Sequence, residues 1–304
     1  MRKGVELLAT KNPFNNIYTL ELRFGVGTDE IRELDMLADC LGRVGSEGHP
    51  SRMFFDALSA LSTTLSATAE PDRFVVELEG PEEHMDNALG LLGELMTFPA
   101  FERRPLRQLR REIWGYRRIS RKDAVNVGDA LKEHVLYGKN SSYRREIGPP
   151  AARRISVGRL QRAWRQVQAH EVEIGYVGTK STDEVATAFA SKVGLPAELA
   201  PAVKPVIYPR VLPDEPTVYF VPRRDAVQTQ VASALYDLVR LREVEAPALG
   251  RGNAALCFLV DIEPLWPSIK NAIRRCRGSV RSIRSRGPPA AAARRQRSHA
   301  PRYG

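Results

Sequence analysis

The sequence predicts an α+β fold. Alternating and helical apolar patterns follow one another in the order strand, helices, strand pair, helices, and a shorter version of this order begins near residue 151. This repetition indicates an internal duplication. The strict strand–helix alternation of a doubly wound parallel sheet is missing from the pattern. The 304 residues are enough to bury a core, and 43% hydrophobic with 27% charged residues is ordinary for a globular protein.

The first α+β cycle covers residues 1–150. Residues 17–25 alternate around Tyr18, Leu20 and Leu22 and predict a strand. Thr28 or Asp29 is the expected N-cap of the helix that follows. The other predicted elements are a hairpin of 63–71 and 73–81, helices over 31–44, from 51, from 82 to 96, over 103–119 and over 124–137, and a loop over 138–150.

The second cycle covers residues 151–230 and is incomplete. Its predicted elements are a helix over 157–170, a strand over 171–179, a helix from 183, a proline-rich linker over 195–215 and a strand pair over 217–222 and 226–232. For residues 231–273 the sequence permits a helix but does not decide the structure. The change in character after residue 231 suggests a truncated or frameshifted C-terminus, with a polar tail as the alternative.

The net charge of +10 comes from the C-terminal segment 274–304, which holds ten arginines, no lysine and no acidic residue. The other 36 basic residues balance the 36 acidic ones. With almost no large apolar side chains, this Arg-rich tail cannot repay its ordering entropy, so we predict that it is disordered. The neutral remainder disfavours a nucleic-acid-binding protein, which would have to use the tail alone.

Two further classes are disfavoured. Three cysteines (Cys40, Cys257 and Cys276) are too few and too scattered for a disulfide framework. No apolar run reaches the length of a membrane helix, so we expect no membrane partner. The N-terminus shows no signal peptide, which favours the cytoplasm, and a truncated N-terminus would leave a periplasmic or secreted location open.

A set of segments carries a family resemblance: NPFNNIYTLELRFGVGTDEI, GSEGHPSRMFFDALSAL, RFVVELEGPEEHMDNALGLLGELM, LRREIWGYRR, DALKEHVLYGKNSSYRREIG and EVEIGYVGT. In order and spacing they resemble the insulinase (pitrilysin) family of zinc metallopeptidases, over about residues 12–230. The likeness is closest to the second, non-catalytic half of the long bacterial members. It implies a fold like that of insulinase and the mitochondrial processing peptidase, a two-layer sandwich in which helices pack on one face of an antiparallel-rich sheet. In that family, an active and an inactive half face each other across a chamber.

The resemblance also implies where a metal site would lie. Active halves carry H-x-x-E-H on the first helix, where two His bind zinc and the Glu activates a water, and a Glu on a later helix is the third ligand. Matching the turn GSEGHP places Met36, Asp39 and Cys40 at the three motif positions and Glu112 at the later one. These four residues are therefore vestigial positions of the family's site.

The residue types at these positions do not suit a hydrolytic zinc site. Such a site needs three protein ligands and an open fourth position, whereas Cys40 and Glu112 supply only two ligands. Met36 is a thioether better suited to copper(I), and Asp39 points about 100° away from Cys40. His49 is a further candidate from a loop. We expect no catalytic residue and no bound metal in this chain, although a metal at Cys40 and Glu112 stays open.

The leading functional hypothesis is a non-catalytic half that forms part of a peptide-binding chamber. Its expected partners are peptide substrate and a catalytic half that binds zinc, encoded in the same polypeptide or by a neighbouring gene. The family's substrate-holding Arg and Tyr have no match after residue 231. Two alternatives stay open, an active zinc metallopeptidase with altered ligands and a nucleic-acid-binding protein that uses the Arg-rich tail. The resemblance implies peptidase ancestry, with an isolated chain that is inactive.

Overall fold

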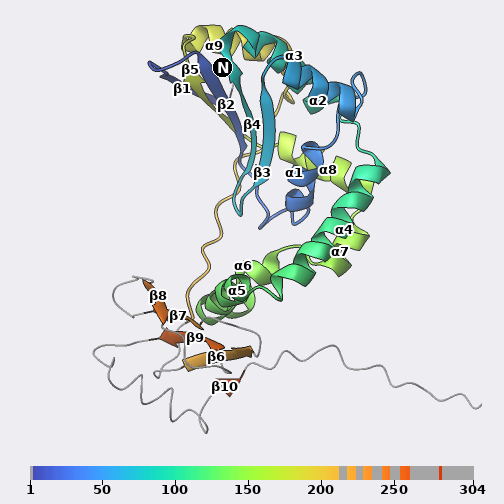
Figure 1. The fold of residues 1–304 in the computed structure, drawn as a ribbon. Coiled ribbons are helices and arrows are strands. Elements are labelled where there is room, and N and C mark those ends of the chain that lie inside the picture. Colours follow the sequence, from blue (N-terminus) through green and yellow to red (C-terminus); the bar gives the residue numbers. More distant parts are fainter. Residues whose placement is uncertain are drawn as a thin grey trace, which may run out of the picture. The chain divides into compact units, whose positions relative to one another are not determined.

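The computed structural model describes residues 3–211, 218–223, 229–234, 242–246, 254–260 and 281–282. The chain forms two compact units, Met1–Val211 and Leu212–Gly304. Figure 1 shows the elements of both units along the chain. In the described part of the chain, no helix has the length and apolar character that crossing a membrane requires.

The first unit is built on a five-stranded sheet with the strand order β1-β5-β2-β4-β3. Its strands are β1 (Val5–Lys11), β2 (Ile17–Phe24), β3 (Thr64–Ala69), β4 (Phe74–Pro81) and β5 (Val172–Gly178). β1 pairs with β5 in parallel, and the other three pairings are antiparallel. The predicted α+β class with an antiparallel-rich sheet is thereby confirmed.

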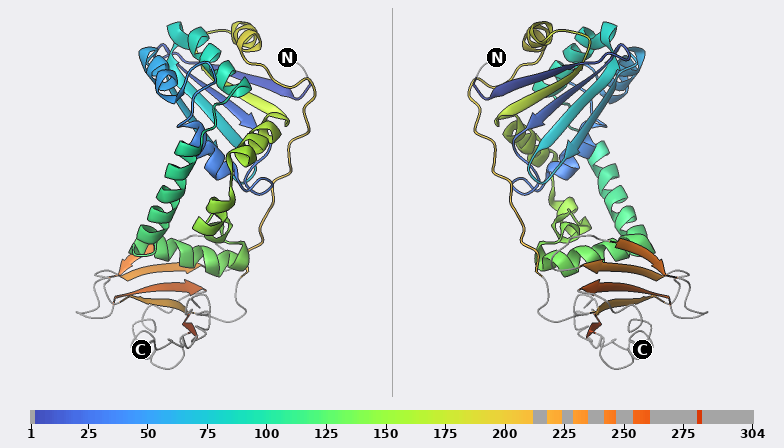
Figure 2. Two further views of the ribbon diagram at one scale, coloured as in Figure 1. Left: turned by 90° about the vertical axis from the view of Figure 1, so that its right-hand side faces the viewer. Right: turned by 90° about the vertical axis from the view of Figure 1, so that its left-hand side faces the viewer.

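Alternation along the strands separates a buried face of this sheet from an open one. The two views in Figure 2 show helices over one side of the sheet only. On that side the central strands bury their alternate side chains, which are Tyr18, Leu20, Leu22, Phe24, Phe74, Val76, Leu78, Val172, Ile174 and Tyr176. The prediction from the period-two pattern is therefore correct for β2, for the β3–β4 hairpin and for β5.

The helices of the first unit follow the predicted order. They are α1 (Leu34–Leu41), α2 (Ser51–Ala60), η1 (Glu82–His84), α3 (Met85–Thr97), α4 (Arg103–Ser120), α5 (Ala124–Tyr137), η2 (Gly138–Asn140), α6 (Ser142–Arg145), α7 (Pro149–Arg154), α8 (Val157–Gln168) and α9 (Thr182–Lys192). Trp164 of α8 fixes the helical layer to the sheet. Its ring meets Phe24 and Phe74 edge-to-face at 6.3 and 6.1 Å, and its indole N–H donates to the Met96 carbonyl at 3.2 Å.

Two local expectations are wrong, and one strand was missed. β1 was not predicted, since it takes its place through parallel pairing with β5, more than 160 residues away in sequence. The first helix starts at Leu34, and Asp29 is not its N-cap but the ion-pair partner of Arg145. The segment 138–150 is not a plain loop, because it contains η2 and α6 and the start of α7.

The second unit contains a sheet with the strand order β10-β6-β9-β7-β8. Its strands are β6 (Val218–Arg223), β7 (Thr229–Ala234), β8 (Arg242–Ala246), β9 (Ala254–Val260) and β10 (Arg281–Ser282). The strand pair predicted around residues 217–232 is present. For residues 231–273 the sequence allowed a helix, whereas the structure has the strands β8 and β9 there. Apart from β10, the Arg-rich segment 274–304 lies outside the described residues. The predicted range 151–230 contributes strands to both sheets.

Candidate functional site: the α1–α4 junction

The four vestigial positions lie where helices α1 and α4 meet. Met36, Asp39 and Cys40 are on α1, and Glu112 is on α4. The pKa values of Asp39 and Glu112 respond to the same neighbouring guanidinium, that of Arg43. The structure thus brings Asp39, Cys40 and Glu112 into one neighbourhood, and Arg43 belongs to it as well.

Arg43 forms the central contact of this junction. Its Nη1 lies 2.8 Å from both carboxylate oxygens of Glu112, and Gln108 donates to Oε1 of the same carboxylate at 3.0 Å. The guanidinium lowers the pKa of Glu112 because it stabilises the carboxylate form. The charge that a metal ion would offer to Glu112 is therefore supplied by a side chain of the protein.

The two sulfur side chains face the core. Met36 and Cys40 are each 1% exposed, and both belong to the main hydrophobic cluster. Burial raises the pKa of the Cys40 thiol to about 11, and Arg43 only partly opposes this effect. A metal ligand must be the thiolate, so the environment of Cys40 disfavours its use as one.

Asp39, which the sequence analysis matches to the general base of the motif, is the remaining acid of the junction. Burial raises its pKa, Arg43 opposes the increase, and the nearby Glu112 adds to it. Among the described residues, no group of three or more His, Cys, Asp and Glu side chains is arranged to hold a metal ion. The donor set of the junction does not fit zinc, since one sulfur ligand is protonated and the distal carboxylate is bound to Arg43.

Sequence reasoning missed Arg43 because it searched for metal ligands only. A signal was available, since Arg43 lies four residues after Asp39, a spacing that places two side chains on one side of a helical segment. A cation on this face, together with a matched Glu on the later helix, predicts an ion pair. The structure contains that pair.

His49, the candidate from the loop, has a different partner. Its Nδ1 lies 2.7 Å from Oε2 of Glu94, and the Ser46 hydroxyl donates to the same oxygen at 2.8 Å. Because Ser46 bonds to the carboxylate and not to the imidazole, the three residues form no nucleophile–base pair. The turn is tight at Gly45, where a Cβ would lie 2.0 Å from the His49 carbonyl oxygen. His49 thus holds a turn against α3.

The free edge of β3 lies beside α1. Among the described strands, β3 is an outer strand of its sheet and pairs only with β4. β3 is also in contact with α1. An outer strand presents unpaired N–H and C=O groups along one side, and an extended peptide can pair with them. Helix α1 therefore lies next to an outer strand of the sheet.

A cavity of about 430 Å³ adjoins the end of β3, where Ala69 and Asp35 are among its lining residues. Inside it Arg145 forms an ion pair with Asp29 and lies over the Tyr208 ring, 4.2 Å from the centroid. Burial raises the pKa of Asp35 to about 6. The cavity thus combines charged and aromatic groups next to the strand edge.

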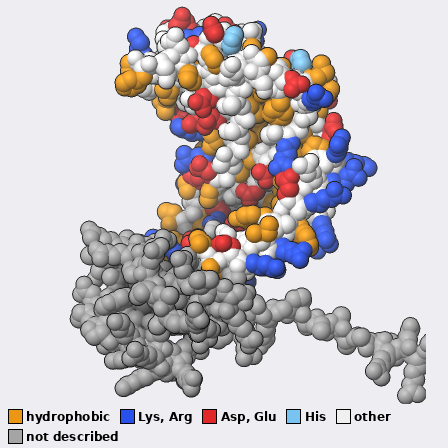
Figure 3. Space-filling model, in the orientation of Figure 1, with side chains coloured by type: hydrophobic (Ala, Val, Ile, Leu, Met, Phe, Trp, Pro, Cys, Tyr) orange, Lys and Arg blue, Asp and Glu red, His pale blue; other side chains and the backbone are white. Residues whose placement is uncertain are grey.

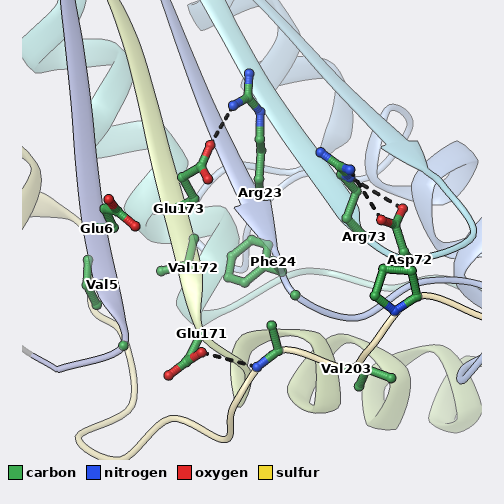
Figure 4. A pocket seen from close by; sticks show the side chains of 14 residues that line it. Val5, Glu6, Arg23, Phe24, Asp72, Arg73, Glu171, Val172, Glu173 and Val203 are labelled. Atoms are coloured by element: carbon green, nitrogen blue, oxygen red, sulfur yellow. Dashed lines mark hydrogen bonds and ion pairs between the residues drawn. The ribbon is translucent and has the colours of Figure 1, made fainter.

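A second cavity, of about 490 Å³, lies where β2 and β5 approach the segment after residue 200 (Figure 4). Arg23 donates to Glu173 at 2.6 Å, and the backbone N–H of Ala202 donates to Glu171 at 3.2 Å. Arg73 is paired with Asp72 at 3.2 Å. Both arginines that line this cavity are therefore already bound to carboxylates, and we assign no ligand to it.

Known structures contain a similar arrangement of elements. The inactive domain of an M16 peptidase from Pseudomonas fluorescens matches with a TM-score of 0.57 and 14% identity, over 77% of this chain and 55% of that one. The first half of the periplasmic protease PqqL from Escherichia coli matches with a TM-score of 0.58 and 14% identity, over 74% and 54%. A protease from Helicobacter pylori matches with a TM-score of 0.54 and 10% identity, over 75% and 55%.

The fold is that of an M16, insulinase-like peptidase domain. At these identities the likeness is one of fold, and the chain spans about half the length of the proteins it matches. The matched structures include both an inactive domain and a first half, so they do not separate the two halves of such proteases. No protein-family model matches the sequence, and no curated protein sequence matches it either.

Proposed function

We propose that this chain is the non-catalytic half of an M16-type zinc metallopeptidase and forms part of a peptide-binding chamber with a catalytic half. The observation that carries the proposal is the Arg43–Glu112 ion pair at the α1–α4 junction. A guanidinium at this place neutralises the carboxylate that would otherwise bind metal, while the buried Cys40 thiol stays protonated. In this proposal the domain keeps the peptidase fold, but its α1–α4 junction neither binds zinc nor hydrolyses peptides.

In this proposal the chain contributes a surface for peptide. The free edge of β3 pairs with an extended peptide, and the cavity beside Ala69 has room for one of its side chains. Zinc and the water-activating Glu come from the partner, which carries an intact H-x-x-E-H. Long peptides make more contacts with this half than short ones do, so the chain should favour their turnover.

The test combines activity with hydrogen exchange. The isolated chain is expected to hydrolyse no peptide above background. Mixing it with a catalytic half encoded next to it should raise turnover of long peptides more than that of short ones. Addition of a long peptide to this complex should slow amide exchange in β3 (Thr64–Ala69), because its edge groups become paired.

The other outer strand is the matched control. β1 (Val5–Lys11) is the other outer strand of the sheet and lies at the edge opposite to β3. Its exchange is expected to be unchanged by peptide. Chelator-sensitive hydrolysis by the isolated chain that disappears in Glu112→Gln, or equal protection of both edges, would contradict the proposal.

A further inference from the structure

Helix α4 carries a straight stripe of positive charge on its solvent side. The stripe consists of the exposed residues Arg103, Arg107, Arg111, Trp114, Arg118 and Arg121, with Arg104 and Lys122 beside it. Its steps of four, four, three, four and three residues follow the α-helical repeat, so the side chains stay on one line of about 27 Å parallel to the axis. Figure 3 shows Lys and Arg side chains gathered along this helix.

The arginines of α4 fall into two groups. Those facing inward are bound, since Arg110 donates to the carbonyls of Ala152 and Ile155, and Arg117 lies 2.6 Å from Glu146. By contrast, within the described part of the chain no carboxylate pairs with an arginine of the stripe. The stripe therefore presents unneutralised guanidinium groups to the solvent.

The surrounding sequence does not balance this charge. Residues 101–170 hold 18 Lys and Arg against six Asp and Glu, whereas residues 1–100 hold eight against 17. The basic charge is thus concentrated in the segment that contains α4. A field of one sign over such a surface attracts and orients an acidic partner.

The composition of the stripe favours a protein partner. It is made of arginines around Trp114, which is 51% exposed and has the Arg118 guanidinium 5.5 Å from its ring centroid. Trp and Arg are enriched in protein interfaces. A membrane surface is disfavoured, since the exposed Tyr116 and Ile119 lie about 200° and 140° around the helix from Trp114 and cannot insert together with it.

We propose that the α4 stripe binds an acidic amphipathic α-helix of a protein partner, laid alongside α4. A helix that carries carboxylates with the same sequence spacing has the same rise per residue, so its carboxylates face the guanidinium groups in register. An apolar residue in the middle of that helix covers Trp114. A nucleic acid matches the charge of the stripe but not its helical repeat. This surface goes beyond the proposed chamber and does not involve β3.

Three probes test the spacing on the full chain. The first is a helical peptide of about 20 residues with glutamates at the stripe spacing and a central leucine; the second has the same composition with glutamates distributed around the helix. The third is single-stranded DNA of similar length. The matched peptide is expected to bind about tenfold tighter than the redistributed one and tighter than the DNA, with the Trp114 fluorescence changing on binding.

Charge reversal locates the binding surface. The double variant Arg107→Glu with Arg111→Glu should bind the matched peptide about tenfold or more weakly, because like charges then face each other. Arg162→Glu with Arg165→Glu on α8 makes the same charge change at other exposed arginines and should have little effect. Circular dichroism checks that both variants fold. Equal binding of the two peptides, equal weakening by the two variants, or tighter binding of DNA would overturn the proposal.

Discussion

The first sheet and the α1–α4 junction belong to the same unit but are held together by different interactions. In the sheet, alternate apolar side chains of β2, β4 and β5 are almost fully buried against the helices. At the junction, the contact on the solvent side is the Arg43–Glu112 pair, whose side chains are 34% and 44% exposed. The difference indicates that the fold depends on the apolar layer. Charged groups at the junction can change without disturbing that layer.

Helix α1 takes part in both regions. Its inner face carries Met36 and Cys40 into the hydrophobic core, while Asp39 and the following Arg43 lie on the side of α4. Two of the positions that the sequence analysis matched to the motif, Met36 and Cys40, thus pack in the core. Stability should accordingly respond strongly to the inner residues of this unit and weakly to the ion pair.

The largest effect is expected in the apolar layer. Trp164→Ala removes the side chain that joins Phe24 and Phe74 to the Met96 carbonyl, and should lower the free energy of unfolding by about 3–5 kcal/mol. Denaturant unfolding measures the change. Trp114→Ala on exposed α4 is the control and should cost about 0.5 kcal/mol or less. Equal losses in the two variants would mean that the sheet–helix contact is not the main source of stability.

An intermediate effect is expected for the thiol of Cys40. With its pKa raised from 9.0 to about 11, the thiolate population near pH 8 falls about a hundredfold, and burial adds to the protection. Alkylation of the folded protein should therefore modify the same number of thiols in the wild type and in Cys40→Ser. After denaturation the wild type should gain one more. Rapid modification of Cys40 in the folded chain would place it at an open site and not in the core.

The smallest effect is expected for the ion pair. Arg43→Met should reduce the free energy of unfolding by only about 0.5 kcal/mol at neutral pH, since both partners are partly exposed. Because Arg43 lowers the pKa of Glu112 in the folded state, this contribution is present above the usual carboxyl pKa and is lost as the pH falls through the lowered value. The difference between wild type and variant should shrink in acid, as urea unfolding at a series of pH values will show.

The stability change in Arg43→Met also has a matched control. Arg52→Met removes a guanidinium from an exposed pair with Asp56, at a longer distance of 3.7 Å and away from the junction. It should change stability less than Arg43→Met does. If Arg43→Met instead lowered the free energy of unfolding by more than about 2 kcal/mol, the ion pair would be a main source of the domain's stability. The contrast with the sheet would then be wrong.

Local patterns predicted most of the first sheet, because β2, β4 and β5 each bury every second residue and so carry a clear period. β1 lacks that signal, since only Val5 is well buried, and its place depends on a strand far along the chain. The short helices after residue 138 are set by their packing and not by an apolar repeat. Long-range pairing and very short elements are therefore what the sequence alone could not predict.

At the candidate site, the resemblance pointed to α1 and α4, and the structure brings these two helices into contact. The match of Met36, Asp39, Cys40 and Glu112 to the motif positions stays a prediction. It did not predict the ion pair of Glu112, because a match to ligand positions says nothing of Arg43. The ion pair needs both the helical spacing on α1 and the approach of α4, and the second of these is a tertiary contact. The arginines of the α4 stripe can be read in the sequence, whereas only the structure shows that no carboxylate of the described residues pairs with them.

The zinc content of the full chain tests the central claim most directly. The protein and its Glu112→Gln variant would be equilibrated with zinc, freed of excess metal and measured by elemental analysis. Because Arg43 neutralises Glu112 and Cys40 is a buried thiol, we expect no stoichiometric zinc in either protein and no difference between them. One zinc ion per wild-type chain that is lost in Glu112→Gln would show that the junction binds metal and would contradict the account.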